Sequence, residues 1–154
     1  MISKVSFPLT SPAFKANGDI PVKYTCEGEN ISPLLLIGEV PSHTKSLAIV
    51  VDDPDADKKI VTHWIAWNIP ADTRMIKEGA RPGTQGKNER GENRYMGPCP
   101  PKGQHHYFFK IYALDQMLDL KEGSGKEELI KAMTGHILAE GELVGLYEKQ
   151  AKAK

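Results

Sequence analysis

The segment 52–57 contains four aspartates; it reads DDPDAD and directly follows an apolar run. Their carboxylate oxygens could ligate a metal ion, but the segment lacks the sixth-position glycine and twelfth-position glutamate of an EF-hand. Aspartates with this spacing also form Asx turns at the ends of strands, and that alternative stays open for each of them. The sequence therefore predicts a polar loop that a binding site can use, and it excludes an EF-hand.

Imidazole and phenol side chains lie in two further apolar runs. His63 lies within IVTHWIAWNI, and a His-His-Tyr triplet opens HHYFFKIYAL. Because side chains alternate along a strand, His63 is expected to share a face with Ile65. By the same rule His105 and Tyr107 point one way, and His106 points the other way. Two adjacent histidines therefore cannot both serve one small site, which argues against a zinc site built from both.

Together these groups have the chemistry to hold an anion such as a phosphate monoester or a carboxylate. An aspartate that accepts a hydrogen bond from one imidazole nitrogen orients the ring and favours its charged form, so the other nitrogen becomes a charge-assisted donor. Tyr107 adds a hydroxyl donor, and backbone N–H groups of the segment 97–103 could add more. Because the aspartates repel an anion unless the imidazoles offset their charge, we expect a modest, pH-dependent affinity.

No residue stands out as a catalytic nucleophile, and we expect a protein that is not an enzyme. Cys99 lies between Pro98 and Pro100, without the helix N-terminus or adjacent base that activates a thiol. The sequence also lacks a Gly-x-Ser-x-Gly elbow, a His-Glu-x-x-His helix, a P-loop and a Gly-x-Gly-x-x-Gly turn. We therefore predict no catalytic residue, no cofactor and no metal ligand.

The elements that must position these groups are mainly short strands. Prolines and glycines divide the first two thirds of the chain into β-branched and aromatic runs, which is typical of a sandwich or barrel. A closing strand is predicted over 143–147, although nearby glycines weaken it. The clearest runs are nearly continuous in apolar residues, which suits inner strands covered on both faces, and they are 46–52, 60–69 and 105–114.

One helix and one long loop complete the prediction. Ser124, with Glu127 three residues later, forms a capping box, and Gly135 is placed to end the helix. The segment 78–101 has almost nothing able to build a core, so we expect a loop of the kind that forms binding sites. The segment 97–103 reads GPCPPKG, and its three prolines make it too stiff for a linker.

Length and charge limit the classes of protein that the chain can represent. Its 154 residues suit a single domain, 1–154, and its 20 basic and 20 acidic side chains cancel, which argues against nucleic-acid binding. The N-terminus lacks a signal-peptide apolar region and no run could span a bilayer, so we expect a cytoplasmic protein without stable membrane insertion. Cys26 and Cys99 are interpreted as two buried thiols, with a single disulfide left open.

Two separated motifs of the chain resemble the signatures of the phosphatidylethanolamine-binding protein family. DPDAD followed by THWIAWNIP is similar to the first signature, and YMGPCPPKGQHHYFFKIYALD is similar to the second. The resemblance extends from SPAFKANGDIPVKYTCEGENISP near the N-terminus to GHILAEGELVGLY near the C-terminus. It is closest to the short bacterial and archaeal branch that includes Raf-kinase-inhibitor-like proteins.

The resemblance implies an antiparallel Greek-key β-sandwich with one or two peripheral helices and a surface pocket for phosphate, acetate or phosphorylethanolamine-like groups. Asp57 replaces the proline that usually follows DPDA, which makes the pocket more acidic. The resemblance to the short branch implies that the long C-terminal helix of animal members is not expected here. The ligand-binding residues carried over from the motifs, including two prolines at the rim, are Asp53, Asp55, His63, Pro100, Pro101, His105 and Tyr107.

Three functions follow as hypotheses. The first is a regulatory protein that binds a small anionic or phosphorylated ligand without catalysis. The second is an inhibitor of serine proteases or of another partner enzyme, since some relatives act in that way. The third is a metal-assisted hydrolase that uses Asp55, His63 and His105. A homodimer is left open.

Overall fold

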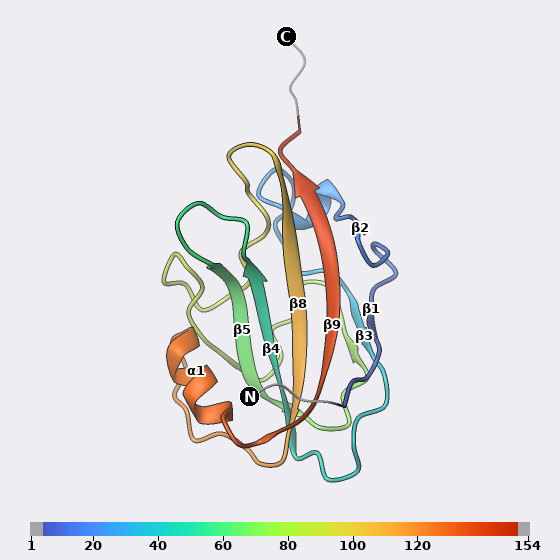
Figure 1. Ribbon diagram of the computed structural model, residues 1–154, viewed down its shortest axis with the longest axis vertical. Coiled ribbons are helices and arrows are strands. Elements are labelled where there is room, and N and C mark those ends of the chain that lie inside the picture. Colours follow the sequence, from blue (N-terminus) through green and yellow to red (C-terminus); the bar gives the residue numbers. More distant parts are fainter. Residues whose placement is uncertain (1–4, 151–154) are drawn as a thin grey trace.

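Two β-sheets make up the structure, a computed structural model that describes residues 5–150 (Figure 1). The larger sheet has six strands in the spatial order β2-β9-β8-β4-β5-β7. Its four long central strands carry the segments predicted to be strands. The six strands are β2 (Gly18–Asp19), β4 (Ser46–Asp53), β5 (Val61–Pro70), β7 (Thr84–Gln85), β8 (Gln104–Leu114) and β9 (Ile137–Glu148).

The smaller sheet packs on one face of the larger sheet and has the order β1-β3-β6. Leu35 and Ile37 are buried in the same cluster as Val51 of β4 and Phe109 of β8, so the two sheets enclose a shared core. This arrangement confirms the predicted β-sandwich. The three strands are β1 (Leu9–Thr10), β3 (Leu35–Ile37) and β6 (Met75–Ile76).

The opposite face of the larger sheet is covered by the helix α1 (Lys126–Met133) (Figure 1). Leu129 and Met133 of α1 pack in a second buried cluster with Val50 and Ile65 of the sheet. Both faces of β4 and β5 are therefore buried, which confirms the prediction of inner strands for two of the three runs. On β8 only one face is fully buried, and the residues of the other face are half-buried. A 3-10 helix, η1 (Val22–Tyr24), lies in the connection between β2 and β3.

Strand β9 is longer than predicted because its glycines permit close packing rather than interrupt the strand. A Cβ atom at Gly145 would come within 2.5 Å of Ile20, and one at Gly141 within 2.7 Å of the Phe7 ring. The segment containing β2 lies against this strand and pairs with it in parallel. The sheet is thus antiparallel apart from this short edge pair, and the Greek-key connection stays a prediction.

The helix starts one residue later than the capping-box prediction. The N-cap is Gly125, whose N–H donates to the Glu128 carboxylate at 2.9 Å. The Ser124 hydroxyl instead donates to the carbonyl of Lys121 at 2.8 Å, so it is used by the preceding turn. The predicted end is confirmed, since Gly135 has the positive φ of 85° that ends many helices.

The segment 78–101 is largely irregular, as predicted, but it does contribute to the core. Tyr95 is buried edge-on against Trp64, with ring centroids 5.6 Å apart. The indole of Trp64 also donates to Gln85 of β7 at 2.9 Å. The prediction that this segment cannot build a core was therefore wrong, because a few spaced aromatic and amide side chains are enough to anchor it.

Candidate functional site

The position of His63 depends on a β-bulge in β5. Val51 of β4 pairs with Trp64, whereas the next residue, Asp52, pairs with Thr62, so His63 is an extra residue in its strand. His63 therefore lies on the same side of the sheet as Tyr107, with ring centroids 5.2 Å apart. Ile65 packs in the cluster beneath α1. The expectation that His63 and Ile65 share a face was wrong, because strict alternation does not survive a bulge.

A cavity of about 240 Å³ opens at the end of the larger sheet where β4 ends and β8 begins. The proline-stiffened segment 97–103 contributes to its wall, as do residues of both signature motifs. Six of the seven predicted site residues line this cavity, and they are Asp53, His63, Pro100, Pro101, His105 and Tyr107. The structure therefore brings together the groups that the sequence separates.

The two oxygens of Asp53 are both used by the protein itself. Oδ2 lies 2.7 Å from Nδ1 of His105, and Oδ1 accepts the N–H of Asp55 at 2.8 Å in an Asx turn. Asp53 is buried and its carboxylate can only accept, so Nδ1 of His105 carries the proton. The remaining nitrogen, Nε2, is left for a ligand. Asp53 therefore forms the predicted turn and also lies in the predicted site.

Asp55 does not line the cavity. Its Oδ2 accepts hydrogen bonds from the backbone N–H of His106 at 2.7 Å and from Nδ1 of His106 at 2.6 Å. These hydrogen bonds to the side chain and backbone of His106 lower the pKa of Asp55. The pair lies on the exposed side of the loop, opposite His105 and Tyr107, as the alternation along β8 predicts.

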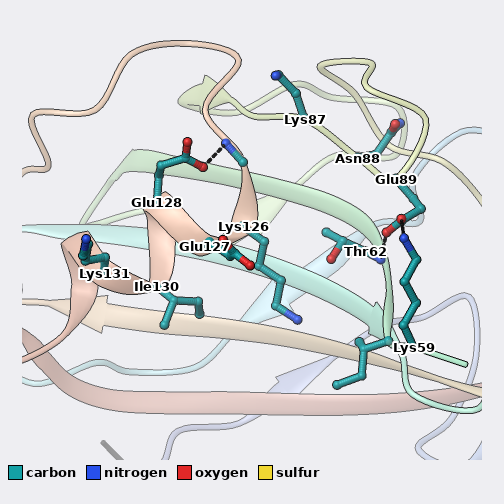
Figure 2. A pocket seen from close by; sticks show the side chains of 12 residues that line it. Lys59, Thr62, Lys87, Asn88, Glu89, Lys126, Glu127, Glu128, Ile130 and Lys131 are labelled. Carbon is teal, nitrogen blue, oxygen red and sulfur yellow. Dashed lines mark hydrogen bonds and ion pairs between the residues drawn. The ribbon is translucent and has the colours of Figure 1, made fainter.

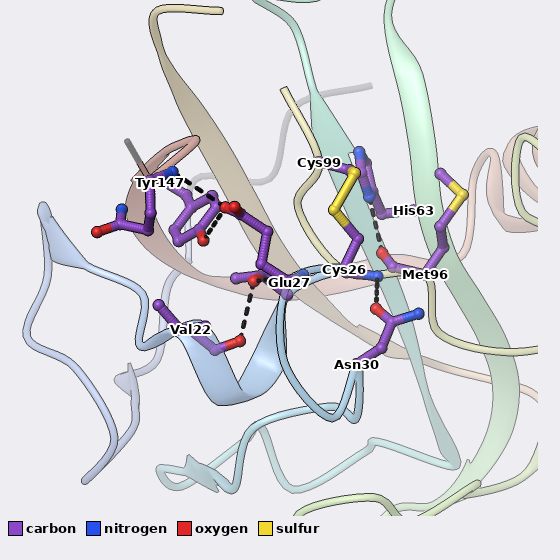
Figure 3. The surroundings of a disulfide bond; sticks show 11 residues. Val22, Cys26, Glu27, Asn30, His63, Met96, Cys99 and Tyr147 are labelled. Carbon is purple, nitrogen blue, oxygen red and sulfur yellow. Dashed lines mark hydrogen bonds between the residues drawn. A yellow bond between two sulfur atoms is a disulfide. The ribbon is translucent and has the colours of Figure 1, made fainter. Parts of the chain in front are cut away.

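His63 is held by a backbone carbonyl rather than by a carboxylate. Its Nδ1 lies 2.7 Å from the carbonyl oxygen of Met96, so Nδ1 donates (Figure 3). Burial lowers the pKa of His63, and the residue is 4% exposed. In the neutral ring Nε2 is an acceptor. Protonation would convert it into a donor for an anion.

Tyr107 carries a buried hydroxyl that is poorly satisfied. The hydroxyl is inaccessible and lacks a hydrogen bond of ordinary geometry within residues 5–150, although the Asp53 carboxylate and the backbone of Cys99 lie close enough to influence it. Burial, and after it the charge of Asp53, raises the pKa of Tyr107, so the hydroxyl keeps its proton. Such an atom costs about 1–3 kcal/mol unless it is satisfied. Its position in the cavity lining provides a donor for a ligand.

The two cysteines form a disulfide, which corrects the interpretation as buried thiols. Cys26, just after η1, and Cys99, in the proline-stiffened segment, have Cα atoms 5.5 Å apart (Figure 3). Both residues are exposed and both line the cavity. Their separation of 73 residues hid this pairing, because only the tertiary fold brings the two loops together.

Several lining residues were missed by the sequence reasoning, among them Asn30, Glu89, Arg90 and Met96. Asn30 accepts the N–H of Gly97 at 2.8 Å and so fixes the start of the proline-stiffened segment. The carboxylate of Glu89 lies 2.5 Å from Lys59. Glu89, Arg90 and Met96 lie in the segment 78–101 that was predicted to form a binding site, but nothing in that segment distinguished these residues from their neighbours.

A larger and more open groove of about 900 Å³ lies between α1 and the segment 87–89 (Figure 2). None of the predicted site residues lines it. Lys126 on its wall pairs with Asp52 at 2.7 Å. Its lining is mostly solvated lysine and glutamate, which is ordinary polar surface.

Comparison with known proteins decides the family. The family model described as phosphatidylethanolamine-binding protein matches residues 10–148. The chain belongs to the phosphatidylethanolamine-binding protein family. The match spans both signature motifs and the whole cavity lining, so the resemblance inferred from the motifs is confirmed.

Relatives of this phosphatidylethanolamine-binding family member occur in archaea and bacteria. A UPF0098 protein of Methanothermobacter thermautotrophicus is 49% identical over 148 residues, covering 92% of this chain and 98% of the relative. A UPF0098 protein of Pyrococcus horikoshii is also 49% identical, over 96% of this chain and 79% of its own. These names assign no activity.

Solved structures agree with the fold. A phosphatidylethanolamine-binding protein homolog from Chlamydia trachomatis superposes with a TM-score of 0.90 at 44% identity, covering 94% of this chain and 99% of that chain. YbcL of E. coli, described as a new member of the mammalian family, superposes at 0.87 with 33% identity over the same shares. Within residues 5–150, no helix is long and apolar enough to cross a membrane.

Proposed function

We propose that the cavity binds a small oxyanion, such as a phosphate monoester or a carboxylate, and that the protein acts as a non-catalytic regulatory binder. The observation that carries this proposal is that His105, whose Nδ1 is held by Asp53, lines the same cavity as Tyr107, whose buried hydroxyl lacks a hydrogen bond of ordinary geometry among the described residues. A ligand oxygen could accept from Nε2 of His105 and, after a small side-chain movement, from this hydroxyl. A cavity of about 240 Å³ suits a headgroup-sized ligand better than a long chain.

The donors around this hydroxyl favour an anion. Nε2 of His105 is free because Asp53 holds Nδ1, and Arg90 adds a cation to the lining. Nε2 of His63 becomes a further donor when an anion draws a proton onto the ring. The exposed Asp57 carboxylate supports a zwitterion such as phosphorylethanolamine, because its charge would attract the ammonium group.

A metal-assisted hydrolase receives less support. Its three expected ligands do not converge, because Asp55 is taken by His106 outside the cavity. No group of three or more His, Cys, Asp and Glu side chains is arranged to hold a metal ion within residues 5–150. A cysteine nucleophile is also unsupported, since Cys99 is engaged in the disulfide.

A titration with phosphate and with phosphorylethanolamine, followed by NMR, tests the proposal. We expect saturable shifts at His63, His105 and Tyr107 at millimolar ligand, with no comparable shifts at His106, which faces the other way. Sodium chloride at matched ionic strength is the control for screening. Unchanged His63, His105 and Tyr107 signals at millimolar concentrations of both ligands would reject anion binding in this cavity.

A further inference from the structure

The disulfide lies at the mouth of the cavity rather than in the core. Cys26 and Cys99 are both exposed, whereas the groups that would contact a ligand, His63 and Tyr107, are buried. An exposed disulfide is open to attack by an external thiolate, and such disulfides are the labile or regulatory ones more often than buried disulfides are. The bond is therefore both accessible and adjacent to the candidate binding groups.

Few other contacts hold the two loops of this mouth together. The N–H of Cys26 donates to the carbonyl of Pro98 at 3.1 Å, and the N–H of Gly97 donates to Asn30 at 2.8 Å. Next to them, the carbonyl of Met96 accepts the hydrogen bond that orients His63. Without the disulfide, these two hydrogen bonds and the one from the Tyr95 hydroxyl to Tyr24 would still join the two loops, and the N–H of Met96 would still donate to the carbonyl of His63 at 2.9 Å. The loosening would therefore fall on the segment 97–103 rather than on Met96.

We propose that Cys26–Cys99 is a redox-sensitive clasp: reduction by a dithiol loosens the 97–103 rim and weakens anion binding in the cavity. The binding part of this proposal rests on the proposed function.

One thiolate of the dithiol attacks a cysteine sulfur, which breaks the S–S bond, forms a mixed disulfide and releases the other cysteine as a thiolate. The second thiol of the dithiol then displaces the first cysteine. Two electrons and two protons pass to the protein, and the dithiol becomes a disulfide.

The architecture favours a reversible change rather than unfolding. On one side of Cys26, the carbonyl of Tyr24 accepts a hydrogen bond from the buried Tyr95 hydroxyl at 2.7 Å. On the other side, Glu27 accepts the hydroxyl of Tyr147 at 2.5 Å (Figure 3). These anchors come from the core and from β9, so they persist without the disulfide. They keep the two cysteines near each other, which permits reoxidation.

The first measurement is reduction of the folded protein with dithiothreitol, scored by thiol titration, together with amide hydrogen exchange. We expect two thiols without denaturant, and faster exchange at 26–30 and 97–103 than in the oxidised protein. Exchange in the central strands β4 and β8 should not change. A bond that resists dithiothreitol until guanidinium unfolds the protein, or equal exchange rates at the rim in both states, would overturn the clasp.

The second measurement is phosphate affinity of the oxidised and reduced protein by NMR. We expect reduced protein to bind at least about threefold more weakly, because the binding-competent rim is populated for less of the time. The double variant Cys26→Ser/Cys99→Ser should bind phosphate as weakly as the reduced protein does, and dithiothreitol should not change its affinity. Equal affinities in the two redox states would overturn the clasp and leave the proposed function intact. If the oxidised protein binds no phosphate, the proposed function fails, and hydrogen exchange alone decides whether the rim is redox-sensitive.

A further variant tests the mechanism of the clasp. Asn30 has a positive φ of 61°, so Asn30→Gly keeps the backbone geometry and removes the acceptor for Gly97. Because Asn30 lines the cavity, the affinity of the oxidised variant serves as its own reference, and the ratio between its oxidised and reduced affinities should exceed the parent ratio. An unchanged ratio would show that the hydrogen bond and the disulfide do not both stabilise the position of the 97–103 rim.

Discussion

The Oδ2 atom of Asp53 lies 2.7 Å from Nδ1 of His105 and joins the end of β4 to the start of β8 at the cavity wall. The contact leaves Asp53 without a free oxygen, because Oδ1 is engaged with the N–H of Asp55. Asp53 is therefore a positioning residue. The group that it presents to a ligand is Nε2 of the imidazole.

The phosphate affinities of His105 and Asp55 variants should show that the ligand binds in the cavity and not on the outer side of the loop. We expect His105→Ala to lower phosphate affinity about tenfold or more, since it removes a charge-assisted donor. Asp55→Ala should change affinity by no more than about twofold, because Asp55 contacts His106 outside the cavity. NMR titration of both variants measures this. A large loss of affinity in Asp55→Ala alone would contradict the placement of Asp55.

Removal of the Tyr107 hydroxyl should affect binding and stability differently. Tyr107→Phe should lower phosphate affinity about tenfold, while the free energy of unfolding stays within about 0.5 kcal/mol of the parent value or rises, since the buried hydroxyl lacks a hydrogen bond of ordinary geometry in the described chain. Tyr95→Phe is the matched control. Its buried hydroxyl donates to Tyr24 at 2.7 Å, so we expect a stability loss of about 1–2 kcal/mol and unchanged affinity. Denaturant unfolding measures the stability of both variants, and NMR titration measures their phosphate affinity. A stability loss in Tyr107→Phe together with an affinity loss in Tyr95→Phe would contradict this prediction.

The buried His63 should make stability decrease at mildly acidic pH. Burial lowers the pKa of His63 below its ordinary value of 6.5, so below pH 6.5 the unfolded chain binds a proton that the folded chain does not. The free energy of unfolding then falls as pH decreases, by at most about 1.4 kcal/mol per pH unit, until the folded ring is protonated. His63→Asn keeps a donor for Met96 without titrating, and it should remove this slope. Urea unfolding between pH 5 and pH 8 compares the two proteins.

The same protonation should couple anion binding to pH. A bound anion favours the charged His63 ring, so sulfate, whose own charge is constant near neutrality, should bind more tightly as pH falls toward 6.5 and below. In His63→Asn the residual pH dependence reports the other titrating groups of the lining. Identical affinity profiles in parent and variant would show that His63 takes no part in anion binding.

The glycines of β9 should be needed for packing. Gly145→Ala places a Cβ within 2.5 Å of Ile20, so we expect the free energy of unfolding to fall by about 1–3 kcal/mol. Glu142→Ala, on the exposed face of the same strand, is the control and should change it by no more than about 0.5 kcal/mol. Thermal or denaturant unfolding distinguishes them. Equal stability of both variants would mean that the strand shifts freely to make room.

Features that depend on neighbours along the chain could be predicted from residue types and their spacing alone. Apolar runs predicted the central strands, because burial on both faces requires them. Period-two alternation placed His105 with Tyr107 and turned His106 away, as found. The motif pair also identified the family, and with it six of the residues that line the cavity.

Features that depend on strand register and on distant partners required the folded structure. The bulge that turns His63 toward Tyr107 arises from pairing with β4, which no pattern within β5 reveals. The disulfide joins residues 73 positions apart, and the choice of Asn30 and Arg90 as lining residues depends on how their loops fold over the site. Side-chain periodicity is a local property, whereas cavities form where separate segments meet. Residue types in one segment cannot specify which distant loop will face them.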